Sequence, residues 1–129
     1  MVDLTWVGEK KNKLRRAGTH LARVFRRHPR IIVSMTSYPA RINTVHFAIR
    51  TLLAQKRLPD KIILWLCESD FPNREDDLPE SLKDVLWHDV EVRWVNNDLK
   101  PHKKYYWALQ EFKDDYVITT DDDLLYRNT

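Results

Sequence analysis

The feature that most constrains the fold of this chain is a regular alternation of short apolar runs with stretches of helical spacing. Four runs rich in β-branched and other apolar residues are predicted to be strands: 31–36, 61–67, 90–95 and 116–120. Three intervening stretches place apolar residues at helical spacing: 43–58, 79–87 and a third that contains Tyr105 to Phe112. Successive strand–helix–strand units with right-handed crossovers are typical of a parallel sheet. We therefore predict an α/β fold with a mostly parallel sheet of about four strands and helices on both faces.

The same spacing predicts which side chains are buried. The run 61–67 is apolar almost throughout, which indicates a strand covered on both faces. The run 116–120 is predicted to be a buried strand that emerges at the rim of the sheet. The helical stretches are expected to bury three apolar stripes: Val45, Ala48, Ile49, Leu52 and Leu53, then Leu82, Val85 and Leu86, then Tyr105, Ala108, Leu109 and Phe112.

The length of 129 residues allows one domain with a core, which we expect to span residues 30–129 behind a basic N-terminal arm, residues 1–29. With 43% hydrophobic and 32% charged residues, the chain is predicted to be globular. The longest apolar run, 62–67, is too short for a transmembrane helix. The only cysteine, Cys67, excludes a disulfide framework, which fits a cytoplasmic location.

The charge is divided unevenly between the arm and the body. Residues 1–30 hold nine Lys and Arg against Asp3 and Glu9, a net charge of +7, whereas residues 31–129 have a net charge of −4. Apolar residues at helical spacing make the arm a basic amphipathic segment. Such a segment is either solvated or packed against protein, or it lies on the inner face of an anionic membrane as a peripheral contact. Nucleic acid is not expected as a partner, because aromatic residues are not interleaved with the basic ones.

Glycine is confined to the arm, at Gly8 and Gly18. The rest of the chain therefore has neither a glycine-rich dinucleotide turn nor a P-loop. Any phosphate bound by the body must be held by a metal ion, by basic side chains or by helix N-termini.

Three consecutive aspartates, Asp121, Asp122 and Asp123, follow the last predicted strand. Adjacent carboxylates repel one another, and hard oxygen ligands of this kind suit Mg²⁺ or Mn²⁺. A solvated acidic loop that caps the strand is the alternative. The other strand ends are also polar, and the carboxyl ends of parallel strands lie at the edge where open α/β sheets bind ligands. The polar clusters expected along that edge are Ser37, Tyr38 and Arg41, then Glu68 and Asp70, then Asn96, Asp98 and Lys100, then the three aspartates.

Four stretches in this order resemble nucleotide-sugar glycosyltransferases of the GT-A fold, in particular those of bacterial polysaccharide gene clusters. The stretch 33–42 (VSMTSYPARI) is similar to the first strand and nucleotide loop of such enzymes, and 53–64 (LAQKRLPDKIIL) to their helix–Gln–Pro–strand passage. The stretch 98–104 (DLKPHKK) resembles a Pro-x-x-Lys element, and 121–123 resembles the DXD motif. The resemblance covers residues 31–126 and implies the Rossmann-like N-terminal half of a GT-A fold.

The resemblance further implies a nucleoside-diphosphate sugar as donor and a glycan or lipid-linked acceptor. Asp121 and Asp123 would hold Mn²⁺ or Mg²⁺, which would neutralise the diphosphate, and Asp122 would face the ribose or sugar. Thr36 and Tyr38 are expected at the nucleoside, Glu68 at the base or ribose, and Arg41 and Lys104 at the phosphates. Ser37 and Asp98 are also expected to bind the donor.

The chain departs from that family at its end, because only six residues follow Asp123 and no side chain matches a catalytic base. We therefore expect the donor-binding fragment of a longer enzyme. Two other readings remain open. One is a non-catalytic association module that acts through its basic arm at a membrane or on a partner. The other, less favoured because phosphate-binding glycines are missing, is a metal-dependent nucleotidyltransferase.

Overall fold

The computed structural model describes residues 29–87, 89–96 and 102–128, apart from the side chains of Lys103 and Lys104. Most of the predicted basic arm, together with Asp98, Lys100 and the Lys104 side chain, therefore lies outside the described part. The elements in chain order are β1 (Ile31–Thr36), α2 (Val45–Leu53), β2 (Lys61–Cys67), the 3₁₀ turn η1 (Arg74–Asp77), α3 (Glu80–Lys83), β3 (Val90–Val95), α4 (Lys103–Glu111) and β4 (Tyr116–Thr119). Three strands have the predicted bounds, and β4 ends one residue earlier than predicted.

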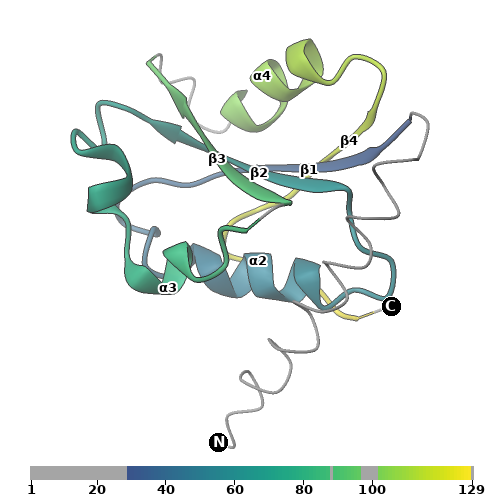
Figure 1. Ribbon diagram of the computed structural model, residues 1–129, viewed down its shortest axis with the longest axis horizontal. Helices are drawn as coiled ribbons and strands as arrows, with labels where there is room; N and C mark the ends of the chain where they lie inside the picture. Colours follow the sequence, from purple (N-terminus) through teal and green to yellow (C-terminus); the bar gives the residue numbers. More distant parts are fainter. Residues whose placement is uncertain (1–28, 88, 97–101, 129) are drawn as a thin grey trace, which may run out of the picture.

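The four strands form one parallel sheet in the order β3-β2-β1-β4 (Figure 1). Ser34 of β1 is in register with Ile63 of β2 on one side and with Thr119 of β4 on the other. This order means that the chain adds strands outward from β1 to β3 and then returns to the opposite side of β1. The predicted parallel α/β architecture is confirmed.

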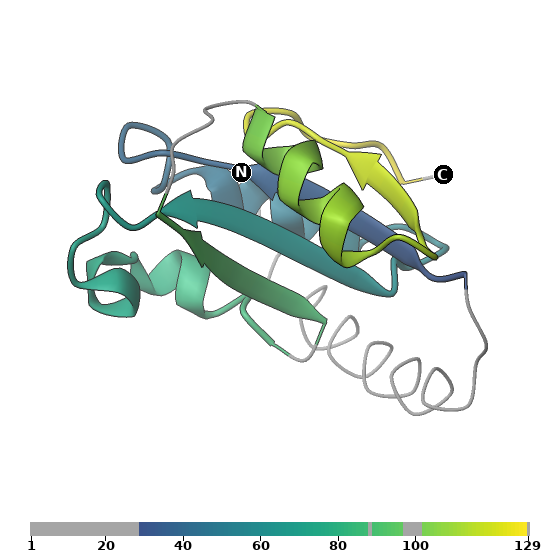
Figure 2. The same cartoon turned by 90° about the horizontal axis from the view of Figure 1, so that it is seen from above.

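The helices lie in two layers, with α4 on one face of the sheet and α2 and α3 on the other (Figures 1 and 2). Alternate residues of β1 and β2 point into the two resulting cores, because side chains alternate between the faces of a strand. Ile32 and Ile63 pack with Ala108 of α4 and with Phe112, which directly follows this helix. The core on the α2 side is larger and is formed by Val33, Met35, Ile62, Leu64, Leu66 and the apolar stripe of α2.

The central strand β2 is buried from Ile62 to Cys67, as predicted for a strand covered on both faces. The last strand is different, and its prediction as a buried strand is wrong. Tyr116 and Ile118 are 65% and 48% exposed. The reason is the strand order, which puts β4 at the edge of the sheet, while the core on the α2 side contains residues of β1, β2 and β3 but none of β4.

Two helical predictions also need correction. Helix α3 has four residues instead of the predicted 79–87, since the hydrogen bonds after it run only three residues back, from Val85 to Leu82 and from Leu86 to Lys83. Leu82 and Val85 are nevertheless buried. In α4, Ala108 and Phe112 are buried as predicted, but Tyr105 and Leu109 are exposed. The side of α4 that contains Ala108 and the partly buried Trp107 faces the sheet instead.

Among the described residues, no helix combines the length and the apolar character that a membrane span requires.

Candidate functional site

The loops that follow β1 and β4 leave the sheet side by side. These two strands pair in parallel, and the pairing extends one residue past the end of β4, where the Thr120 N–H donates to the Ser34 carbonyl at 3.0 Å. Ser37 and Tyr38 therefore emerge next to the three aspartates, although more than 80 residues separate the two loops in the sequence. The sheet edge predicted from the sequence does bring these two clusters together.

Asp122 is the buried centre of this cluster. Its carboxylate accepts a hydrogen bond from the Ser37 hydroxyl at 2.9 Å and another from Nη1 of Arg41 at 3.0 Å. Ser37 and Asp122 are only 2% and 8% exposed. A buried carboxylate is tolerated when it is paired and hydrogen-bonded, and both oxygens of Asp122 meet that condition. Asp122 thus ties the loop after β4 to the loop after β1.

Arg41 connects the buried aspartate with an exposed one. The same Nη1 atom lies 3.0 Å from Oδ2 of Asp123, and the guanidinium lies over the ring of Tyr38, 5.5 Å from its centroid. The hydrogen bond to Asp122, helped by the charges of Asp122 and Asp123, raises the pKa of Arg41 above its ordinary value. Because a guanidinium has five N–H donors, Arg41 has donors for an anion besides those that bind the aspartates. We name Ser37, Tyr38, Arg41, Asp121, Asp122 and Asp123 the aspartate cluster.

The aspartate cluster is also held from the opposite side, by residues that the sequence did not indicate. The backbone N–H of Asp121 donates to the hydroxyl of Tyr126 at 3.0 Å, and the N–H of Tyr126 donates to Oγ1 of Thr51 at 3.1 Å. The side-chain amide of Gln55 donates to the carbonyl of Arg127 at 2.8 Å. Thr51 lies on α2 and Gln55 just beyond its end, at a spacing of four residues. No local sequence signal marks these contacts, since the partners are 75 and 72 positions apart.

The carboxylates of the cluster fit a divalent ion only when further oxygens complete its shell. Within the described part of the chain, no group of three or more His, Cys, Asp or Glu side chains is arranged to hold a metal ion. Asp121 and Asp123 are exposed at the rim, and Asp123 is paired with Arg41. Mg²⁺ commonly takes one or two carboxylates together with waters and substrate phosphates. Asp121 and Asp123 have the chemistry for that arrangement.

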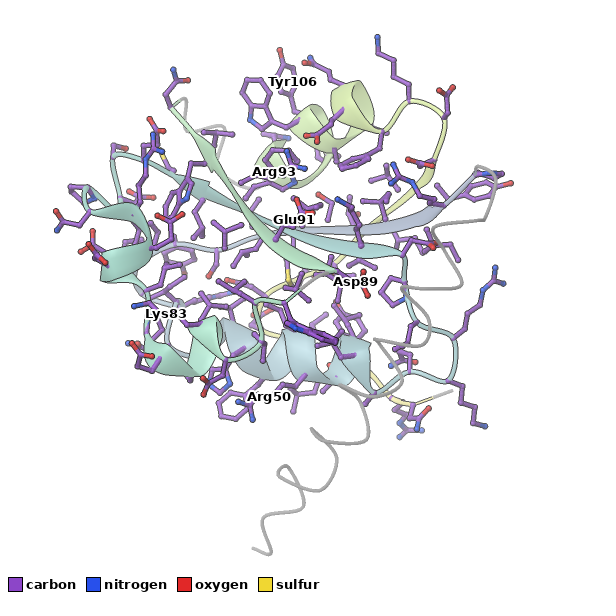
Figure 3. All side chains as sticks on the ribbon, viewed as in Figure 1. Arg50, Lys83, Asp89, Glu91, Arg93 and Tyr106 are labelled. Carbon is purple, nitrogen blue, oxygen red and sulfur yellow. The ribbon has the colours of Figure 1, made fainter. Side chains whose placement is uncertain are left out.

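A pocket of about 410 Å³ lies at the ends of the other two strands. It is lined by Trp65, Glu68, Arg93, Trp94, Val95, Asn96, Trp107 and Glu111. Its volume falls in the range of small-molecule sites, and aromatic walls with a few polar groups are typical of such sites. Figure 3 shows Arg93 rising from β3 on the side of the sheet where Tyr106 marks α4. We call this the tryptophan pocket.

Two of the polar side chains that line the tryptophan pocket, Arg93 and Glu111, belong to a chain of ion pairs. Arg93 lies 2.9 Å from Glu91 and 2.9 Å from Glu111 of α4, and Lys61 lies 2.5 Å from Glu91. Burial by itself would raise the pKa of Glu91, but Lys61 and Arg93 together hold that pKa below its ordinary value. The indole Nε1 of Trp107 is buried and has no hydrogen-bond partner in the described part of the chain.

The predicted site residues fall into two groups. Ser37, Tyr38, Arg41 and the three aspartates meet in the aspartate cluster, with Thr36 at the adjoining end of β1. Glu68 instead lines the tryptophan pocket, where it pairs with Arg74 at 2.5 Å. Both groups lie at the carboxyl edge of the sheet, but over different pairs of strands. Asp98 and the side chain of Lys104 lie outside the described residues.

The fold and this edge together define an α/β protein with a polar carboxyl edge, the edge at which open α/β sheets bind their ligands. No protein-family model matches the chain, and no curated protein matches it significantly.

Proposed function

We propose that the chain binds a nucleoside-diphosphate sugar along the carboxyl edge of its sheet, as the donor-binding part of a metal-dependent glycosyltransferase. The observation that supports this most is the presence of two complementary sites on that one edge. The aspartate cluster offers carboxylates and a guanidinium, and the tryptophan pocket offers aromatic walls with hydrogen-bonding groups. A nucleoside diphosphate needs both kinds of surface, one for its phosphates and one for its base.

The spacing of the two sites suits one extended ligand. The aspartate cluster is centred on β1 and β4, and the pocket on β2 and β3. Neighbouring strands are about 4.8 Å apart, so the two sites are separated by roughly 10 Å along the edge. In the proposed complex the base enters the tryptophan pocket near Glu68 and Asn96, and the diphosphate extends towards Arg41.

At the aspartate cluster, Asp121 and Asp123 would hold Mn²⁺ or Mg²⁺. The ion, when bound, supplies positive charge that offsets the charge developing on the diphosphate as the bond to the sugar breaks. Arg41 would keep its contact with buried Asp122 and direct its remaining donors to phosphate oxygens. Asp122 therefore orients the cation that meets the phosphate, and Tyr38 supports the guanidinium from its ring face.

The experiment is titration calorimetry of the full chain with UDP and with GDP, each with and without Mn²⁺. We expect one of the two nucleotides to bind, and to bind more tightly with Mn²⁺. Asp123→Ala should lower the gain in nucleotide affinity that Mn²⁺ provides by at least about tenfold. Mutation of residues that only support metal ligands already lowers metal affinity or activity by about 10- to 100-fold. Asp114→Ala is the matched control, because Asp114 is an exposed aspartate in the turn that precedes β4. Absence of binding under all four conditions would refute the proposal.

A second candidate function, association with another polypeptide, is favoured by one observation. Tyr116 and Ile118 of the edge strand β4 are exposed at 65% and 48%, and exposed apolar edges are surfaces on which further strands pair. Light scattering on the purified chain tests this reading. A monomer at all concentrations that binds nucleotide supports donor binding, and an oligomer without nucleotide binding supports association.

A further inference from the structure

The chain that follows the aspartates doubles back along α2. In Figure 1 this C-terminal segment passes from the end of β4 to the side of the sheet on which α2 lies. Residues 124–128 have no helix or strand of their own. Tyr126 and Arg127 of this segment contact Thr51 of α2 and Gln55 just beyond it, and these contacts help to hold the loop that carries the aspartates.

Tyr126 is the centre of these contacts. Its ring is partly buried against the core on the α2 side, and its N–H donates to Oγ1 of Thr51 at 3.1 Å. Packing and this hydrogen bond fix the ring from two directions, so its hydroxyl occupies a defined place. That hydroxyl accepts the backbone N–H of Asp121 at 3.0 Å. The Tyr126 side chain thereby links the two ends of the loop formed by residues 121–126.

Thr51 is itself held in place for this contact. Its hydroxyl donates to the Ala48 carbonyl at 2.8 Å, which leaves its lone pairs to accept the Tyr126 N–H. One helical turn later, Gln55 donates both to the Thr51 carbonyl at 3.1 Å and to the Arg127 carbonyl at 2.8 Å. The end of α2 thus presents a prearranged donor and acceptor to the segment after the aspartates.

We infer that Tyr126 is a positioning residue, which acts with Thr51 to aim the carboxylates of the aspartate cluster at a metal-bound diphosphate. This inference rests on the proposed donor-binding function. Asp122 is fixed from the β1 side by Ser37 and Arg41. Tyr126 supplies a further anchor, at the backbone N–H of the preceding residue, Asp121.

Loss of the Tyr126 hydroxyl should weaken only the metal-dependent part of nucleotide binding. Two exposed carboxylates bind an ion well only when their separation and direction match its coordination geometry. Removal of the Tyr126 hydroxyl leaves the ring packing intact but lets the Asp121 backbone exchange its partner for water. The carboxylates then sample geometries that do not bind the ion, while the tryptophan pocket is unchanged.

The test measures one ratio, the affinity for UDP or GDP with Mn²⁺ divided by the affinity without it, using the nucleotide that the wild-type chain binds more tightly. Tyr126→Phe should lower this ratio by about two- to tenfold, the worth of one hydrogen bond, and leave the metal-free affinity unchanged. Tyr116→Phe, which removes a phenolic hydroxyl on the exposed edge strand, is the matched control and should not change the ratio.

A second pair of variants separates positioning from general loss of structure. Thr51→Val removes the acceptor at nearly constant shape and should lower the ratio by a similar factor, whereas Thr51→Ser keeps the hydroxyl and should preserve it. Circular dichroism at the titration temperature confirms that each chain is folded. If the wild-type ratio is well above one and both Tyr126→Phe and Thr51→Val have the same ratio as wild type, this inference is overturned, but the proposed function is not. A wild-type chain without metal-dependent nucleotide binding overturns the proposed function as well.

Discussion

Arg41 and Asp122 lie 3.0 Å apart at the carboxyl edge of the sheet, although they are 81 positions apart in the sequence. This contact closes the junction between the first strand and the last. It also couples the fold to the site, because the arginine that stabilises the buried aspartate is also paired with the exposed Asp123. The same side chain thus stabilises the protein and presents positive charge at the proposed diphosphate site.

The burial of Asp122 predicts that it stabilises the fold more than its neighbour Asp123. Asp122→Ala removes two charge-assisted hydrogen bonds and leaves the buried Ser37 hydroxyl without its acceptor, which should cost about 2–4 kcal/mol of unfolding free energy. Asp123→Ala is the matched comparison. The Asp123 side chain is 50% exposed, so its loss should cost no more than about 1 kcal/mol. Urea unfolding measures both, and equal losses would contradict the structural role given to Asp122.

The ion pairs around Glu91 predict an acid-sensitive contribution to stability. The pKa of Glu91 is lower in the folded protein than in the unfolded chain, so the folded state binds fewer protons near that pKa. The stabilisation is therefore complete above the unfolded pKa, about 4.3, and is lost as pH falls through the lower folded value. Glu91→Gln should flatten the decline of stability below about pH 4.5.

The control for Glu91 is Glu80→Gln, since the Glu80 side chain is 84% exposed. Thermal unfolding midpoints measured from pH 6 down to about pH 3 give the two profiles. A decline that is as steep in Glu91→Gln as in wild type would show that Lys61 and Arg93 do not stabilise the carboxylate of Glu91.

The tryptophan pocket predicts a loss of nucleotide affinity that does not depend on metal. Trp107→Leu removes one aromatic wall, and base stacking on an aromatic ring is worth about 1–3 kcal/mol. The affinity for UDP or GDP should therefore fall by at least about fivefold, both with and without Mn²⁺. Leu109→Ala, at an exposed position on α4 that does not line the pocket, should have little effect. A loss seen only with Mn²⁺ would place the base elsewhere.

The edge position of β4 predicts that two isoleucines of the sheet contribute very differently to the free energy of unfolding. Ile63 in β2 is fully buried, and Ile63→Ala should cost about 3–4 kcal/mol of unfolding free energy. Ile118 in β4 is 48% exposed, so Ile118→Ala should cost about 1 kcal/mol. Denaturant unfolding measures both values. Similar costs would mean that the outer side of β4 is covered in solution, which would favour the association reading.

The architecture could be predicted from the sequence because it depends on local periodicity and on a general rule of handedness. The runs 31–36, 61–67 and 90–95 have unmistakable strand composition, and the helical stretches between them require parallel pairing. A parallel sheet in turn places all strand ends on one edge. The meeting of Ser37 and Arg41 with the aspartates follows from this reasoning, without knowledge of any individual contact.

The errors arise where the outcome depends on the order of strands or on contacts between distant segments. The run 116–120 has the composition of a buried strand, but only the tertiary order β3-β2-β1-β4 decides that it lies at the edge. In α4, Tyr105 and Leu109 are as apolar as Trp107 and Ala108, so spacing alone does not choose which side faces the sheet. Tyr126 and Thr51 are ordinary residues in the sequence and gain their role only when the chain doubles back.

The position of β4 beside the first strand has a consequence for how the protein acquires its site during folding. Strands one to three can assemble in the order in which they are made, but the fourth must return across the sheet to join the first. Contacts over such long stretches of chain form late, because loop closure must precede them. The acidic loop should therefore take its final shape in the closing stage of folding, and a partly folded intermediate would display three mutually repelling charges without any affinity for nucleotide.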